Sequence, residues 1–258
     1  MNTTRPNCRL LAAACVLALG AAFALPAIQA RDWDWSKGEQ VQGNGNVQRQ
    51  ARELGAFSGV ALSLPGKVEI RSGSREGITV ETDANLLPLI ETVVEDGTLK
   101  IRAKGHMMPK TRNLKFIVQA REIERLSVSG SGDIDADAVR GDRMQIAIGG
   151  SGDVNVRKAE GADLRANVSG SGDLRVDEGS VRSLSLSIAG SGDVDLARVR
   201  SDDVKVNIAG SGDAKVWARN ELNVSVAGSG DVEYYGDPRV RKSVAGSGGV
   251  HRAGGDPR

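Results

Sequence analysis

The tripeptide Gly-Ser-Gly occurs seven times in the second half of this 258-residue chain, and Asp follows it in six copies. The copies begin at Gly130, Gly150, Gly170, Gly190, Gly210, Gly228 and Gly246. The first four intervals between copies are therefore equal, and the last two are slightly shorter. A fixed period of about 20 residues is typical of a solenoid in which each repeat forms one coil.

Apolar residues flank each motif at even offsets, as Leu126 and Val128 do before Gly130 and Ile134 does after it. Side chains of a strand alternate between two faces, so even offsets place the apolar residues and both motif glycines on one inward face. Ser131 and its equivalents then face solvent. The sequence therefore predicts an all-β fold, a right-handed parallel β-helix (solenoid) with coils of about 20 residues.

Each coil needs two bends. The sequence of the first bend is nearly the same in every repeat, whereas that of the second bend varies. Gly at the motif permits a narrow bend and close backbone approach, and the residue before the motif is Ser, Gly or Ala in every copy. The second bend varies in sequence and accounts for the shorter repeats near the end of the chain. We expect it to be a surface loop at Val139–Asp142, Ala159–Ala162 and Gly236–Arg239.

The region before the repeats also alternates apolar and polar residues. Short runs from Gln42 to Gly105 are separated by turn signals such as Pro65-Gly66 and Asp96-Gly97. Asn85–Val94 is the one helix-like interruption, and Pro88 limits any helix there to about one turn. These runs predict further half-buried strands.

The N-terminal segment 1–30 has the pattern of a secretory signal peptide: a basic start, an apolar run and a small-residue cleavage site at Ala27–Ala30. Both cysteines, Cys8 and Cys15, lie within it, so the exported chain would contain no disulfide. A lipoprotein signal using Cys15 is the alternative. We predict a signal peptide at 1–30, a flexible leader at 31–41, a β-helix domain at 42–250 and a C-terminal tail at 251–258.

The remaining charges are nearly balanced and interspersed, which argues against nucleic acid as a partner. No later apolar stretch is long enough to span a membrane, so we expect no span in the exported chain. We therefore expect an exported protein that is located in the periplasm, at the cell surface or outside the cell.

Stacked coils would place the six motif aspartates in a ladder whose neighbouring charges repel. The residues are Asp133, Asp153, Asp173, Asp193, Asp213 and Asp231. Hydrogen bonds from turn amides or Ser hydroxyls would offset this repulsion. The alternative is a calcium-stabilised repeat protein, because carboxylates and turn carbonyls bind calcium.

The last copy departs from the template. Lys242 occupies an apolar offset, and Gly249 replaces the Asp. A charge on a terminal coil opposes further stacking, so we interpret this coil as a cap. Near it, Trp217 and the pair Tyr234-Tyr235 are candidates for a contact patch, although Tyr234 falls on the inward parity.

No catalytic constellation appears. The adjacent acid pairs fall in predicted turns, and no nucleophile elbow or phosphate loop is present. We therefore assign no catalytic, cofactor-binding or metal residues and expect no cofactor. A carbohydrate-active β-helix enzyme is a less favoured alternative to a non-catalytic module.

Three segments, Arg52–Val60, Asp83–Leu87 and Asp96–Ile101, precede the Gly-Ser-Gly-Asp coils in a fixed order. This series resembles the bacterial head GIN domain family over about residues 42–250. The family is described as heads of auto-transporter adhesins and is otherwise of unknown function. The resemblance implies an exported β-helical protein. We expect a binding or structural module of the bacterial envelope that contacts an envelope polymer or surface ligand through its flat faces and its Ser/Asp edge.

Overall fold

The computed structural model describes residues 39–257 except residue 106, so the predicted signal peptide and most of the predicted leader lie outside the described residues. The N-terminal part contains β1 (Glu39–Gln42), β2 (Val47–Glu53), β3 (Gly59–Leu62), β4 (Lys67–Ser72), β5 (Gly77–Asp83), β6 (Ile90–Glu95), β7 (Thr98–Ala103), β8 (Met107–Lys110) and β9 (Lys115–Ala120). The repeat part contains β10 (Arg125–Gly130), β11 (Asp133–Gly150), β12 (Val154–Gly170), β13 (Leu174–Gly190), β14 (Val194–Gly210), β15 (Ala214–Gly228), β16 (Val232–Tyr235), β17 (Arg239–Gly246) and β18 (Val250–Gly254). The predicted domain limits at 42 and 250 fall at the end of β1 and the start of β18.

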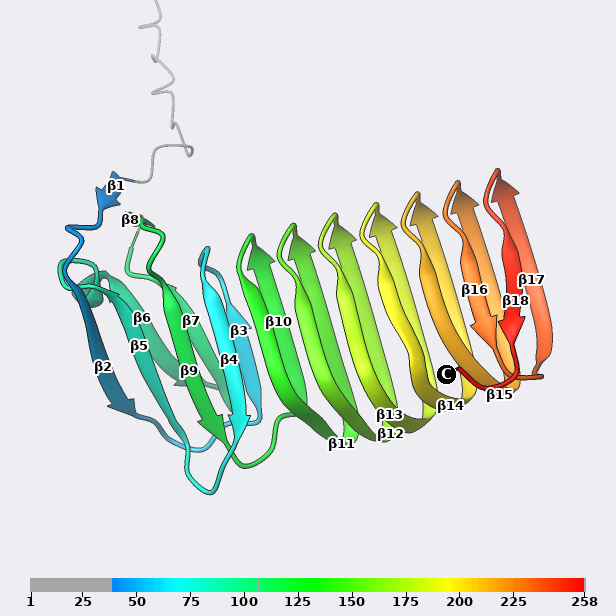
Figure 1. The fold of residues 1–258 in the computed structure, drawn as a ribbon, viewed down its shortest axis with the longest axis horizontal. Coiled ribbons are helices and arrows are strands. Elements are labelled where there is room, and N and C mark those ends of the chain that lie inside the picture. Colours follow the sequence, from blue (N-terminus) through cyan, green and yellow to red (C-terminus); the bar gives the residue numbers. More distant parts are fainter. Residues whose placement is uncertain (1–38, 106, 258) are drawn as a thin grey trace, which may run out of the picture. The chain divides into compact units, whose positions relative to one another are not determined.

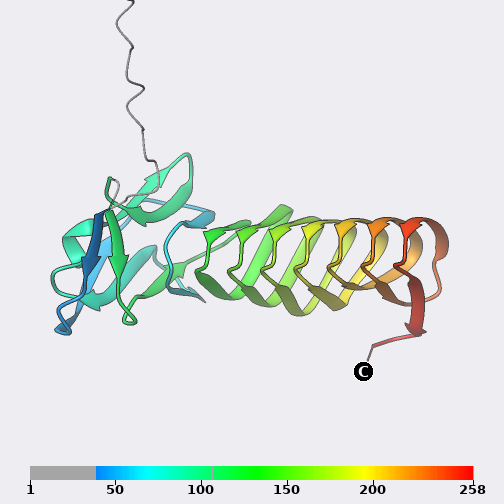
Figure 2. The same cartoon turned by 90° about the horizontal axis from the view of Figure 1, so that it is seen from above.

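The repeat part is a β-solenoid in which each coil pairs in parallel with the next (Figure 1). Equivalent residues of successive repeats are partners, as Ile146 is with Ala166 and Ala166 with Leu186. Figure 2 shows the coils as a row of flattened turns. The predicted parallel β-helix, with one sequence repeat per coil, is confirmed.

The core consists of the apolar residues predicted from the even offsets. Ile134, Leu164 and Val206 are fully buried, and equivalent residues in neighbouring coils lie above and below them. Burying such a side chain contributes about 1.5–3 kcal/mol to the free energy of folding. Because buried residues of neighbouring coils stack on one another, the coils share one continuous core.

The motif glycines form a seam of close backbone contacts. The first glycine of each motif has a positive φ, from 107° at Gly130 to 141° at Gly228, and is at most half-buried. The second glycine is buried in the inner coils, and a Cβ on Gly152 would overlap the carbonyl oxygen of Gly132. The expectation that both glycines face inward is therefore correct only for the second, because the positive φ of the first interrupts the strand alternation.

In the inner coils the second bend is a paired part of the strand and not the expected surface loop, whereas the loop expected at Gly236–Arg239 is present between the end of β16 and the start of β17. Strand β11 continues through Val139–Asp142, and Val139, Arg140 and Gly141 pair in register with the next coil. The bend does absorb the shorter repeat, because the pairing of β14 with β15 shifts register there, between Leu196 and Asp203.

The N-terminal part departs from pure parallel stacking. Strands β2, β5 and β9 pair antiparallel, as do β6 and β7, while β3 and β4 continue the parallel ladders of β10 and β11. Within the predicted helix-like segment, the structure has a short 3₁₀ turn, η1 (Leu87–Leu89), which contains Pro88.

Arg52 closes this end of the core. Its guanidinium donates hydrogen bonds to the carbonyl oxygens of Leu87 and Ile90 and to Thr92 Oγ1, at 2.8–3.0 Å. Partial burial lowers the pKa of Arg52. These bonds join β2 to η1 and β6.

The opposite end of the solenoid has no such closure among the described residues. Strand β17 pairs with β15, β18 pairs with β16, and all eight residues of β17 are exposed. Lys242 lies opposite Val224, in a column that is apolar in the inner coils.

Substitution at the seam tests the stacking. Gly172→Ala would place a Cβ against the carbonyl oxygen of Gly152 and 3.0 Å from Ile148 Cγ2, and we expect it to lower the free energy of unfolding by ~1–3 kcal/mol. Gly149→Ala is the matched control, because its Cβ would meet nothing nearer than Val128 O at 3.7 Å. Urea unfolding measures both, and equal stabilities for the two variants would contradict the seam.

Candidate functional site

One broad face of the solenoid carries two adjacent columns of small uncharged residues, which we call the small-residue face. Both columns lie on the strand segments before the motifs, and their members pair in register from coil to coil. The first column is Ser127, Ala147, Asn167, Ser187, Asn207, Ser225 and Ser243; the second is Ser129, Gly149, Ser169, Ala189, Ala209, Ala227 and Ala245. All are exposed or half-buried.

The polar groups on this face are available to a ligand. Within the described part of the chain, no side-chain hydrogen bond engages Asn167, Ser187 or Asn207. Strands of neighbouring coils lie ~4.8 Å apart, so hydroxyl, amide and methyl groups repeat at that spacing. The two columns can offer many weak, regularly spaced contacts without desolvating a charge of their own.

The aspartate ladder is held by hydrogen bonds between consecutive coils. The backbone N–H of Asp153 donates to Asp133 Oδ1 at 3.1 Å, and the same bond repeats at each following Asp. The series ends where the Gly249 N–H donates to Asp231 Oδ1 at 2.6 Å. Turn amides therefore offset the repulsion between carboxylates, as the first of the two sequence hypotheses predicted.

A groove of about 490 Å³ runs beside the ladder, lined by four ladder aspartates together with Arg175 and Lys215. Among the described residues, no three His, Cys, Asp or Glu side chains come together as metal ligands. The described residues also include no helix that is long and apolar enough to cross a membrane.

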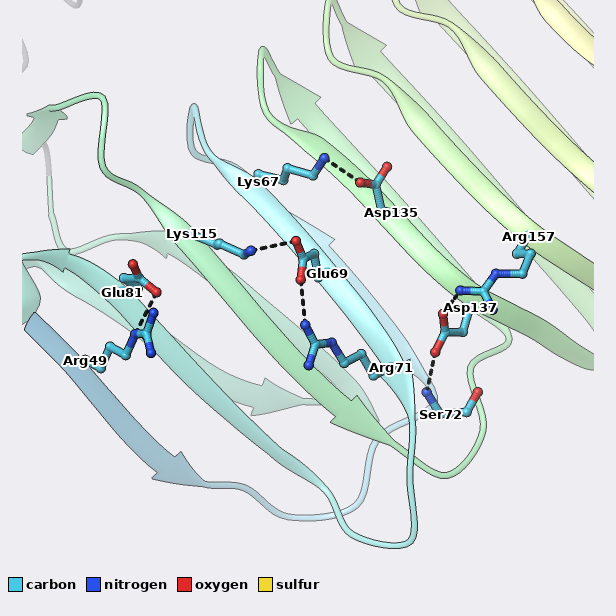
Figure 3. A network of polar contacts seen from close by, with 10 residues as sticks. All are labelled: Arg49, Lys67, Glu69, Arg71, Ser72, Glu81, Lys115, Asp135, Asp137 and Arg157. Carbon is cyan, nitrogen blue, oxygen red and sulfur yellow. Dashed lines mark hydrogen bonds and ion pairs between the residues drawn. The ribbon is translucent and has the colours of Figure 1, made fainter.

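The other broad face is charged, and ion pairs connect its strands (Figure 3). Glu69 lies 2.6 Å from Lys115 Nζ and 3.0 Å from Arg71, and these cations lower the pKa of Glu69. Lys67 lies 2.6 Å from Asp135, whose hydrogen bond and charge raise the pKa of Lys67. Asp137 accepts from Arg157 at 2.6 Å and from the Ser72 N–H at 3.3 Å. The partners satisfy one another, which leaves this face less available to a ligand.

The three aromatic residues proposed as a contact patch do not form one group. Tyr234 packs against the core, as its parity predicted. Trp217 and Tyr235 are register partners on neighbouring coils, and both are half-buried. Sequence reasoning named the flat faces in general but did not single out the small-residue face, although its columns can be read from the offsets before each motif.

The ladder gives a first prediction for this site. Asp173→Ala removes the acceptor for the Asp193 N–H, so we expect a loss of ~1 kcal/mol in the free energy of unfolding. Asp173→Asn keeps an acceptor oxygen and should be more stable than the Ala variant in urea unfolding. An Asn variant as unstable as the Ala variant would contradict the role assigned to this hydrogen bond.

Calcium gives a second prediction. Because backbone amides already bind one oxygen of each ladder carboxylate, we expect equal melting temperatures with millimolar calcium and with a chelator. Differential scanning calorimetry measures both, with magnesium as a control for ionic strength. A calcium-specific rise in melting temperature would instead support the calcium-stabilised repeat.

Several solved structures share this fold. A protein from Bacteroides fragilis, described as a "putative adhesin", has a TM-score of 0.77 and 20% identity, covering 82% of this chain and 99% of its own. A "putative lipid binding protein" from Parabacteroides distasonis has a TM-score of 0.67 and 27% identity, covering 83% and 100%. A "putative adhesin" from Parabacteroides merdae has a TM-score of 0.67 and 20% identity, covering 83% and 99%. No curated protein matches the chain.

The family comparison agrees with the order of motifs in the sequence. The profile of the family described as "Putative auto-transporter adhesin, head GIN domain" matches residues 56–238, which is more than half of the chain. The match includes β3 to β16 and most of the small-residue face. The chain therefore belongs to the head GIN domain family.

Proposed function

We propose that the protein is an exported, non-catalytic binding module of the bacterial cell envelope, with an adhesin-like role. The observation that carries the proposal is the small-residue face, where two columns of Ala, Ser, Asn and Gly extend over seven coil positions. Family membership and the signal-peptide pattern of residues 1–30 support the envelope location.

The chemistry of the face favours binding over catalysis. Ala, Ser, Asn and Gly side chains have no group that titrates near neutral pH, so the face offers no general acid or base. Their small size lets an extended chain approach the sheet closely, and free hydroxyl and amide groups can donate and accept hydrogen bonds. These properties suit a neutral, extended polymer.

We therefore propose a neutral glycan chain of the envelope as the ligand class. Contacts that repeat at ~4.8 Å along a rigid face are individually weak but add over the length of a polymer. A charged polymer would lose more solvation on the two columns, which hold no opposite charge.

A pair of asparagines in one strand allows a matched test. Asn167 lies on the small-residue face and Asn155 on the charged face, and both are exposed in β12. We expect Asn167→Lys to weaken binding to an insoluble neutral glycan about tenfold. The reason is that the ammonium group of the new lysine would lose water on binding without gaining a charged partner. Asn155→Lys should bind as the unaltered protein does.

Co-sedimentation with chitin, cellulose and purified peptidoglycan measures the affinity, and melting temperatures confirm that both variants are folded. Equal loss in the two variants, or no binding to any neutral glycan, would contradict the proposal. Released sugar fragments in the supernatant would support the enzyme alternative.

A further inference from the structure

A depression of about 620 Å³ lies between strands β2 and β6 and the turn η1. Within the described residues β2 pairs only with β5 and β6 only with β7, so no strand covers the space between these two edges (Figure 1). Small-molecule sites commonly have a volume of about 300–1,000 Å³. The depression is therefore large enough for a small ligand.

Arg52 is held rigidly in the wall of this depression. Three of its five N–H groups donate to neutral acceptors of η1 and β6, which are Leu87 O, Ile90 O and Thr92 Oγ1. These bonds fix the plane of the guanidinium before any ligand arrives. A ligand that binds Arg52 would therefore lose little affinity to the ordering of this side chain.

The remaining edge of the guanidinium has only a neutral, exposed partner. Arg52 Nε and Nη2 both donate to Gln50 Oε1, at 3.0 and 2.8 Å. Two parallel N–H groups of this kind are the edge that binds a carboxylate or a phosphate in a bidentate manner. Because the Gln50 side chain is exposed, an anion can displace its oxygen without breaking a contact in the core.

The positive charge in the depression has no counter-ion. Among the described residues, no carboxylate pairs with Arg52 or with the exposed Lys104, which also lines the depression. Glu91 is the acidic residue of the lining, and it is already bound to Arg102 at 2.7 Å. Partial burial lowers the pKa of Arg52, because the charged guanidinium has lost water. An anionic ligand would compensate both cations.

We propose that this depression binds a small organic anion with a carboxylate or phosphate head group and an apolar body. The head group takes the place of Gln50 Oε1 on Arg52, and Lys104 supplies the second positive charge. The apolar body lies against Pro88 and Val93, which line the same depression and are exposed and half-buried. This inference does not depend on the ligand of the small-residue face.

Isothermal titration calorimetry of the full chain with hexanoate, acetate and inorganic phosphate tests the ligand class. We expect hexanoate to bind about tenfold more tightly than acetate, because about two of its methylene groups would be buried. Comparison of phosphate with acetate identifies the preferred head group. Equal affinities for hexanoate and acetate would contradict the contact with Pro88 and Val93, and no binding of any of the three would overturn the proposal.

Two glutamines of β2 provide a matched pair of variants. Gln50→Glu would place a carboxylate on the free edge of Arg52, so it should abolish anion binding and raise the melting temperature of the unliganded protein. Gln48→Glu adds the same charge to an exposed residue of the same strand that does not line the depression. It should bind hexanoate as the unaltered protein does.

Lys104→Gln tests the second cation and should weaken binding about tenfold. Melting temperatures confirm that each variant is folded. Equal binding by Gln50→Glu and Gln48→Glu would overturn the proposal, as would a Gln50→Glu variant that melts no higher than Gln48→Glu. The second result would show that Arg52 does not lack a counter-ion.

Discussion

Direct contact between the backbones of successive coils is the interaction on which this structure depends. At the seam, the carbonyl oxygen of Gly130 accepts hydrogen bonds from the N–H groups of Ser151 and Gly152, at 2.8 and 3.1 Å. The next coils repeat the arrangement, and the first glycine of each motif makes room for it, because a Cβ on Gly150 would overlap the Gly130 oxygen. Any slip by one residue would replace a glycine with a side chain, so the seam fixes the register of the whole stack.

Because the register is fixed, equivalent residues of successive coils form columns. Each column has its own structural role. Inward columns build the core, as Leu184 and Val204 do. The aspartate column connects the coils through backbone N–H groups, and the charged face connects them through ion pairs. Among the described residues, side chains of the small-residue face such as Asn167 have no internal hydrogen-bond partner, and this supports the proposal that the ligand binds there.

The repeat part could be predicted from the sequence because two periods coincide there. Alternation identified buried residues such as Leu186, and the longer repeat period identified which residue stacks on it. The N-terminal pairing could not be predicted, since alternation in β2 and β5 shows which face is buried but not which strand lies beside it. Sequence variation at Val139–Asp142 suggested a loop, whereas backbone pairing there tolerates many side chains.

The in-register seam also has a consequence for how such a protein can change in evolution. Because each inner coil contacts only its two neighbours, a tandem duplication of about 20 codons would add one coil and leave both specialised ends intact. Each added coil would lengthen the small-residue face by one row, so the length of this face can be adjusted stepwise by gene length alone.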